Sequence, residues 1–212
     1  MMGLFGFKRK KAKKSLISDK DYHFLPEPEA CRGKHHEDFT KKEAKLMFEW
    51  WVGEVPKRTE WLFDYVNMYI DLPLKYDFET FKKLVDYLPH MITIRKLSSK
   101  EYENKKSQLP PMMWDNLNDW EFTRESNIII LWVAGYLGTI MIKETPGTCW
   151  KLDTAKSSVN YNRPYISFPN GLRLQVINIS EVIAYKIIDH EDLRLDFMIS
   201  AWKRKSKLKI EK

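Results

Sequence analysis

The sequence has little cysteine, and its N-terminus does not have the pattern of a secretion signal. Only Cys31 and Cys149 occur in 212 residues, and they lie far apart. Secreted domains that depend on disulfides are much richer in cysteine. In residues 1–14 the apolar residues precede the lysine-rich run, which is the reverse of the order in a secretory signal. We therefore expect no disulfide scaffold and a cytoplasmic protein.

Long hydrophobic runs are also scarce. The longest nearly continuous run, Ile128 to Ile142, covers 15 positions, whereas a membrane-spanning helix needs about 20 apolar residues. Thr123 is placed to cap a helix here, and Pro146-Gly147 to end it. We therefore expect a buried core helix. Its small residues, Ala134, Gly135 and Gly138, are expected to form a face against which another element packs closely.

Motifs for cofactors and metals are missing as well. The glycines of the central helix do not follow a strand and a glycine-rich loop, the context that a phosphate-binding site requires. Cys31, His35 and His36 are possible metal ligands at short spacing. A structural zinc site needs four ligands, and neither Cys149 nor His190 has the spacing to complete one. The sequence thus predicts no metal site and no cofactor.

Acid/base chemistry is the remaining route to an enzyme. In Asp189-His190-Glu191-Asp192 a histidine lies among acids, which favours its protonated form. An enzyme with a site built from dispersed residues, such as His190, Glu43 and Arg58, is therefore one alternative. It requires that these side chains meet in a pocket. A solvated turn between two helices is the simpler interpretation of the acidic cluster, and we lean away from an enzyme.

The net charge of +7 is concentrated at the two ends of the chain. Residues 1–14 carry +6 and residues 203–212 carry +5, so residues 15–202 carry 7 minus 11, or −4. The folded body is therefore predicted to be mildly acidic. A peripheral binder that contacts an anionic membrane or nucleic acid weakly through its basic tails is a further alternative, and salt would screen that binding.

Helical patterns dominate the N-terminal half. We expect a basic and polar extension and linker at 1–38, a single domain at 39–202 and a basic tail at 203–212. Thr40 and Glu43 have the spacing of a capping box, and Pro56 predicts a break or kink at 53–55, followed by a second helix. Asp77 is expected to cap a further helix, and Ser98 with Glu101 a charged one after a short strand at 92–95.

Strand patterns appear after the central helix. Segments 148–152, 163–168 and 172–179 are rich in β-branched and aromatic residues, and Pro169-Asn170-Gly171 indicates a hairpin between the last two. Ser180 is expected to cap a C-terminal helix that is interrupted at 189–192 before a final segment at 193–202. The predicted fold is α+β: N-terminal helices and a buried central helix packed on a small antiparallel sheet, with a C-terminal helix.

Residues 39–186 resemble a family of uncharacterised bacterial proteins, in the same order and with similar spacing. The segments that carry the resemblance are Phe39-Thr40-Lys41-Lys42-Glu43-Ala44, Phe48-Glu49-Trp50-Trp51, Val55-Pro56-Lys57-Arg58, 74–81, Gly135-Tyr136-Leu137-Gly138, Trp150 and Asn162-Arg163-Pro164. The family usually has acids where this chain has Val133 and Thr139. The resemblance implies a bacterial protein, and the two replacements count against catalysis.

Large aromatic residues supply the candidate binding surface. Trp50 and Trp51 are adjacent, so on a helix they point about 100° apart and one of them can leave the core. An exposed tryptophan beside Arg58 would resemble an interaction hot spot, whereas burial in the core is the simpler alternative. We predict a partner-binding set of Trp50, Arg58, Trp150 and Tyr165. The function predicted first is a non-catalytic protein-binding module, such as an immunity-type inhibitor of a toxin.

Overall fold

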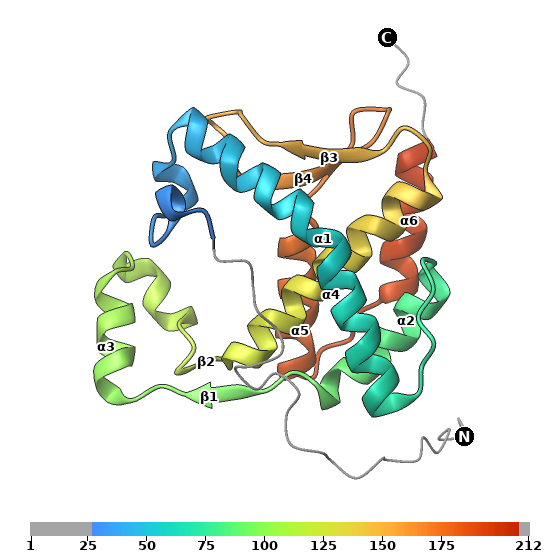
Figure 1. Cartoon of the computed structure of the whole chain (residues 1–212). Helices are drawn as coiled ribbons and strands as arrows, with labels where there is room; N and C mark the ends of the chain where they lie inside the picture. Colours follow the sequence, from blue (N-terminus) through green and yellow to red (C-terminus); the bar gives the residue numbers. More distant parts are fainter. Residues whose placement is uncertain (1–26, 208–212) are drawn as a thin grey trace.

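The structure is a computed structural model that describes residues 27–207 (Figure 1). These residues form an α+β fold of six α-helices, two small antiparallel sheets and four short 3-10 helices. The α-helices are α1 (Lys41–Ile70), α2 (Phe78–Tyr87), α3 (Ser99–Ser107), α4 (Arg124–Glu144), α5 (Val176–Ile188) and α6 (Leu195–Lys207). One sheet pairs β1 (Ile94–Lys96) with β2 (Trp120–Phe122), and the other has the order β3 (Cys149–Leu152), β4 (Pro164–Ser167), β5 (Arg173–Leu174). The 3-10 helices are η1 (Glu29–Cys31), η2 (His36–Asp38), η3 (Leu88–His90) and η4 (Pro111–Asn116).

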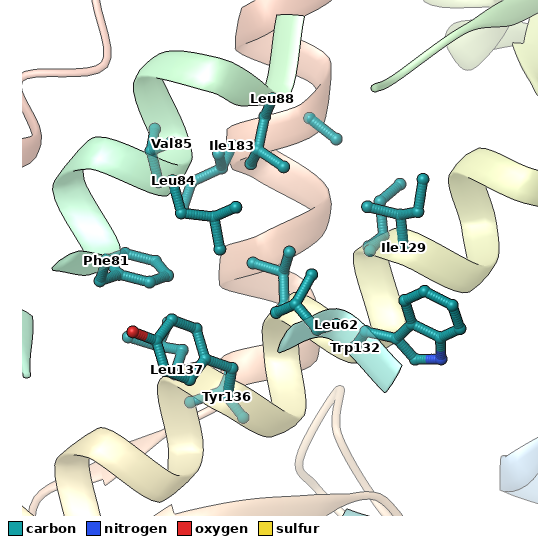
Figure 2. Packing of buried hydrophobic residues seen from close by; sticks show 14 of the residues in the cluster. Leu62, Phe81, Leu84, Val85, Leu88, Ile129, Trp132, Tyr136, Leu137 and Ile183 are labelled. Atoms are coloured by element: carbon teal, nitrogen blue, oxygen red, sulfur yellow. The ribbon is translucent and has the colours of Figure 1, made fainter. Parts of the chain in front are cut away.

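Helix α4 is the centre of the fold, as predicted. It packs on α1 and α5, and its side chains are buried on nearly every side. Figure 2 shows Trp132, Tyr136 and Leu137 of α4 among core residues of α1, α2 and α5. Helix α4 has 21 residues, more than the 15-residue apolar run on which the sequence-based prediction relied, and by length and composition it could cross a membrane. Because 72% of its apolar stretch is buried inside the protein, we assign it as a core helix.

Helix α1 runs through Pro56 without a break, so the predicted division at 53–55 is wrong. A proline inside a helix removes one hydrogen bond and costs about 3 kcal/mol. Pro56 lies on the exposed side of α1, where water can reach the carbonyl that loses its partner. Trp51 before the proline and Leu62 after it are both buried in the core. Burial on both sides of Pro56 favours one continuous helix over two separate ones.

Four of the five predicted helix caps are confirmed. Thr40 and Ser98 form complete capping boxes with Glu43 and Glu101, and the side chains of Asp77 and Thr123 accept backbone hydrogen bonds at the starts of α2 and α4. These caps satisfy backbone N–H groups that have no partner within the helix. The short-range signals therefore located the starts of four helices correctly.

The capping box of α1 gives a pH-dependent contribution to stability. The Lys34 ammonium, followed by the Thr40 amide and hydroxyl, lowers the pKa of Glu43 to about 2. A carboxylate with a depressed folded-state pKa contributes stability above its unfolded value of about 4.5, and that contribution disappears as the pH falls from there toward 2. We expect Glu43→Gln to flatten the loss of stability between these pH values in chemical denaturation. If the free energy of unfolding of the variant falls as steeply with decreasing pH as that of the wild-type protein, Glu43 does not have this role.

The three-stranded sheet confirms the hairpin but not the length of its last strand. Gly171 has a φ of 84°, the left-handed conformation that suits glycine in the turn between β4 and β5. Strand β5 then ends at Leu174, and the residues predicted to continue it begin α5 instead. Val176, Ile183 and Ile187 recur at helical intervals and are buried. Ser180, the predicted cap, consequently lies inside α5, and α6 continues to Lys207 rather than ending at Trp202.

Candidate functional site

The predicted partner-binding residues fall into buried and half-buried positions. Arg58 has no exposed surface and Tyr165 is 6% exposed, so neither side chain can be reached by a partner in this conformation. Trp50 and Trp150 are half-buried. Trp150 pairs across the sheet with Ile166, and because successive side chains alternate between faces, Tyr165 points to the opposite face of the sheet.

Arg58 instead belongs to an aromatic cluster that joins α1 to the sheet. Its guanidinium carbon lies 5.1 Å from the ring centroid of Trp50 and 4.8 Å from that of Trp51, distances suited to cation–π contact. Burial lowers the pKa of Arg58 to about 10, while the charge of Glu54 raises it. The guanidinium therefore remains protonated at neutral pH. The cluster is best described as a structural core element.

Trp150 reaches from this cluster to the small-residue face of α4. Its ring lies edge-on to that of Trp51, with 6.0 Å between the centroids. A Cβ added to Gly138 would come within 2.4 Å of Trp150 Cζ2. The glycine at this position therefore makes room for the indole. This contact confirms the expectation that another element packs closely against the small residues of α4.

The enzyme alternative built from His190, Glu43 and Arg58 is not supported by the geometry. Glu43 and Arg58 are 15 residues apart on the continuous helix α1, which separates them by about 22 Å along its axis. Glu43 is held by Lys34 and Thr40, and Arg58 is buried. His190 is exposed in the turn after α5, with a φ of 55°. The three side chains do not form a common pocket.

A projecting arm offers a different candidate site. The arm comprises residues 94–122: β1, α3, η4 and β2. Figure 1 shows α3 standing away from the helices of the body, and α3 has no buried residue. Arg95 forms ion pairs with Glu101 of α3 and Glu121 of β2. The pairing of β1 with β2 and these ion pairs hold α3 against the two-stranded sheet.

The base of the arm is joined to the start of α4. The Thr93 amide donates to Ser126 Oγ at 2.7 Å, and Ser126 Oγ donates to the Thr93 carbonyl at 2.8 Å. The Thr123 hydroxyl, which caps α4, lies 2.9 Å from that of Thr93. This network ties the arm to the most buried helix of the fold. The hydrogen bonds therefore fix the position of the arm relative to α4.

The tip of the arm is apolar and exposed. We define it as Met112, Met113 and Trp114 of η4, whose exposed fractions are 85%, 49% and 38%. Trp114 Nε1 donates to the carbonyls of Lys106 and Leu109, at 3.1 Å in both cases. Lys106 Nζ lies 4.7 Å from the centroid of its ring. The indole is thus held in place while part of its surface faces solvent.

The tip lies outside the partner-binding set predicted from the sequence. The sequence predicts a charged helix capped by Ser98, but no binding site in the residues that follow Pro111. The available signal was a run of three large apolar residues directly after Pro110-Pro111, beside a highly charged helix. A charged helix offers no apolar surface against which these three side chains could be buried. That pattern favours an exposed contact surface.

Comparison with protein-family models, with curated proteins and with solved structures finds no match.

Proposed function

We propose that this protein is a non-catalytic protein-binding module whose contact surface is the tip of the arm. The observation that carries the proposal is the exposed indole of Trp114, anchored by two hydrogen bonds and flanked by Met112 and Met113. Tryptophan is enriched among the residues that dominate binding energies, and a side chain held in place before binding loses less entropy. Methionine adapts its shape to a partner surface.

The charge of the arm favours a protein as the partner. Residues 94–122 contain five basic and five acidic residues, so the arm is neutral overall. Anionic membranes and nucleic acids attract surfaces with an excess of lysine and arginine. A protein surface with an apolar pocket and mixed charges around it is the better complement to this tip.

The specific form we propose is an immunity-type inhibitor that acts in the cytoplasm by occupying a toxin. Its support is the resemblance of residues 39–186 to small bacterial proteins, together with a contact surface displayed on a projecting arm. The purified full-length chain should form a stoichiometric complex with the product of an adjacent gene in the source organism and inhibit it. A complex that forms equally well with Met112→Ser, which alters only the tip, would contradict the assigned surface.

A weak contact with anionic membranes or nucleic acid through the basic ends is the second candidate. Its support in the described residues is α6, where Lys203, Arg204 and Lys205 are exposed. Because α6 continues to Lys207 and buries Ser206, the deletion variant that tests the ends removes 1–14 and 208–212 and replaces the exposed Lys203, Arg204 and Lys205 with serine rather than deleting them. Binding to anionic vesicles that is lost in this deletion and weakened by salt would support the candidate; unchanged vesicle binding would exclude this role for the deleted ends.

A further inference from the structure

Three neighbouring side chains at η2 bring metal-ligating atoms together. Atoms from His35, His36 and Glu37 all lie within 4.8 Å of one another. Within residues 27–207 this is the only group of three histidine, cysteine or acidic residues that converges in this way. Cys31, which the sequence grouped with these histidines, donates its thiol to the Glu43 carbonyl instead.

The neutral ring of His36 is held in a tautomer that leaves Nε2 available to a metal ion. Its Nδ1 lies 2.8 Å from the Tyr161 carbonyl oxygen. Since a carbonyl oxygen can only accept, Nδ1 carries the proton and Nε2 keeps its lone pair. Histidines that bind metals usually donate their other ring N–H to a carbonyl or carboxylate in this way, which fixes the orientation of the ring.

The Tyr161 carbonyl is itself held in place by the loop between β3 and β4. Asn162, which is 4% exposed and has a φ of 64°, donates its side-chain amide to the carbonyls of His36 and Phe39 at 2.9 and 3.1 Å. Its backbone amide donates to the Asp153 carbonyl at 2.7 Å. The loop therefore fixes both the backbone of His36 and the acceptor for its ring. Hydrogen bonds of this kind hold the ring of a metal-binding histidine in one orientation.

We propose that His35, His36 and Glu37 bind a divalent transition-metal ion through two imidazole nitrogens and one carboxylate oxygen. Imidazole suits zinc, nickel and copper, whereas magnesium and calcium prefer oxygen ligands. Three protein ligands leave one position of a tetrahedral zinc ion for water. His35 and Glu37 are exposed, so their side chains can turn toward an ion beside the fixed ring of His36.

The test is a calorimetric titration of the full-length chain with Zn²⁺, in parallel with His35→Ala, Glu37→Gln and the matched control His190→Ala. His190 is also exposed beside acidic residues, but its group does not converge. We expect one zinc ion per chain and no change in the control. Each ligand variant should lose about tenfold or more in affinity, because even the loss of an outer hydrogen-bond partner of a ligand costs about 10- to 100-fold. Equal affinity in the wild-type chain and both ligand variants, or no heat with the wild-type chain, would overturn the proposal.

Nitrogen NMR of His36 gives an independent readout that does not depend on a substitution. On addition of Zn²⁺, the Nε2 resonance should shift while Nδ1 keeps its proton and its bond to the Tyr161 carbonyl. The same amount of Mg²⁺ should leave both resonances in place. A zinc-dependent shift confined to other histidines, with Nε2 of His36 unchanged, would contradict the assignment.

Discussion

Replacing Gly138 with alanine is expected to destabilise the protein by about 1–3 kcal/mol, the usual cost of forcing an extra methyl group into a packed core. The added Cβ would come within 2.4 Å of Cζ2 and 2.8 Å of Cη2 of the Trp150 ring. Either the indole or α4 must then move. Because Trp150 also packs against Trp51, the displacement should spread to the contact between α1 and β3. Chemical denaturation measures the loss.

Gly135→Ala is the matched control on the same helix. A Cβ at this position would lie 3.7 Å from Val55 Cγ1, which is ordinary van der Waals contact. Alanine is the better helix former by up to about 1 kcal/mol, so this variant should be as stable as the wild-type protein or more so. In a Trp150→Ala background the penalty at Gly138 should largely disappear. A Gly138→Ala variant as stable as Gly135→Ala would show that the indole does not pack against α4 in this way.

Replacing Trp114 with alanine is expected to weaken binding of the protein partner by about 2 kcal/mol or more, roughly 30-fold in the dissociation constant. The substitution removes both the exposed ring and the indole N–H that holds the end of α3. Met112→Ser is the companion variant, because an 85% exposed side chain can be changed without altering the core. Calorimetry with the purified partner measures both variants.

Phe197→Ala provides the control for nonspecific loss of apolar surface. Phe197 lies on α6 and is 69% exposed. We expect this variant to bind the partner with wild-type affinity. If Phe197→Ala weakens binding while Trp114→Ala and Met112→Ser do not, the contact surface lies on α6 and the assignment to the arm is wrong.

Local signals in the sequence predicted much of the fold because they act over only a few residues. A cap such as Thr40 needs only the backbone three residues ahead, and the turn at Gly171 needs only a positive φ. The two largest errors arise from tertiary packing. Burial of Trp51 and Leu62 outweighed the break expected at Pro56, and burial of Val176 and Ile183 in the core favoured α5 over the expected strand. Propensity is a weak guide where packing decides.

The candidate sites were harder to predict because they depend on exposure and on distant partners. The sequence identified Arg58 and three aromatic residues as unusual but could not show that Arg58 is fully buried. Likewise, nothing near His36 in the sequence predicts that its ring reaches Tyr161, which lies 125 residues away. Met112 and Trp114 are candidates for binding because the arm exposes them to solvent. Such properties arise only when the chain has folded.

The location of the partner on the folded protein tests the central proposal most directly. Hydroxyl-radical footprinting of the complex reports the accessibility of methionine and tryptophan side chains, and the tip contains both. We predict strong protection of Met112, Met113 and Trp114 in the complex, with Phe197 as reactive as in the free protein. Unchanged reactivity at the tip in a saturated complex, or protection confined to α6, would contradict the account.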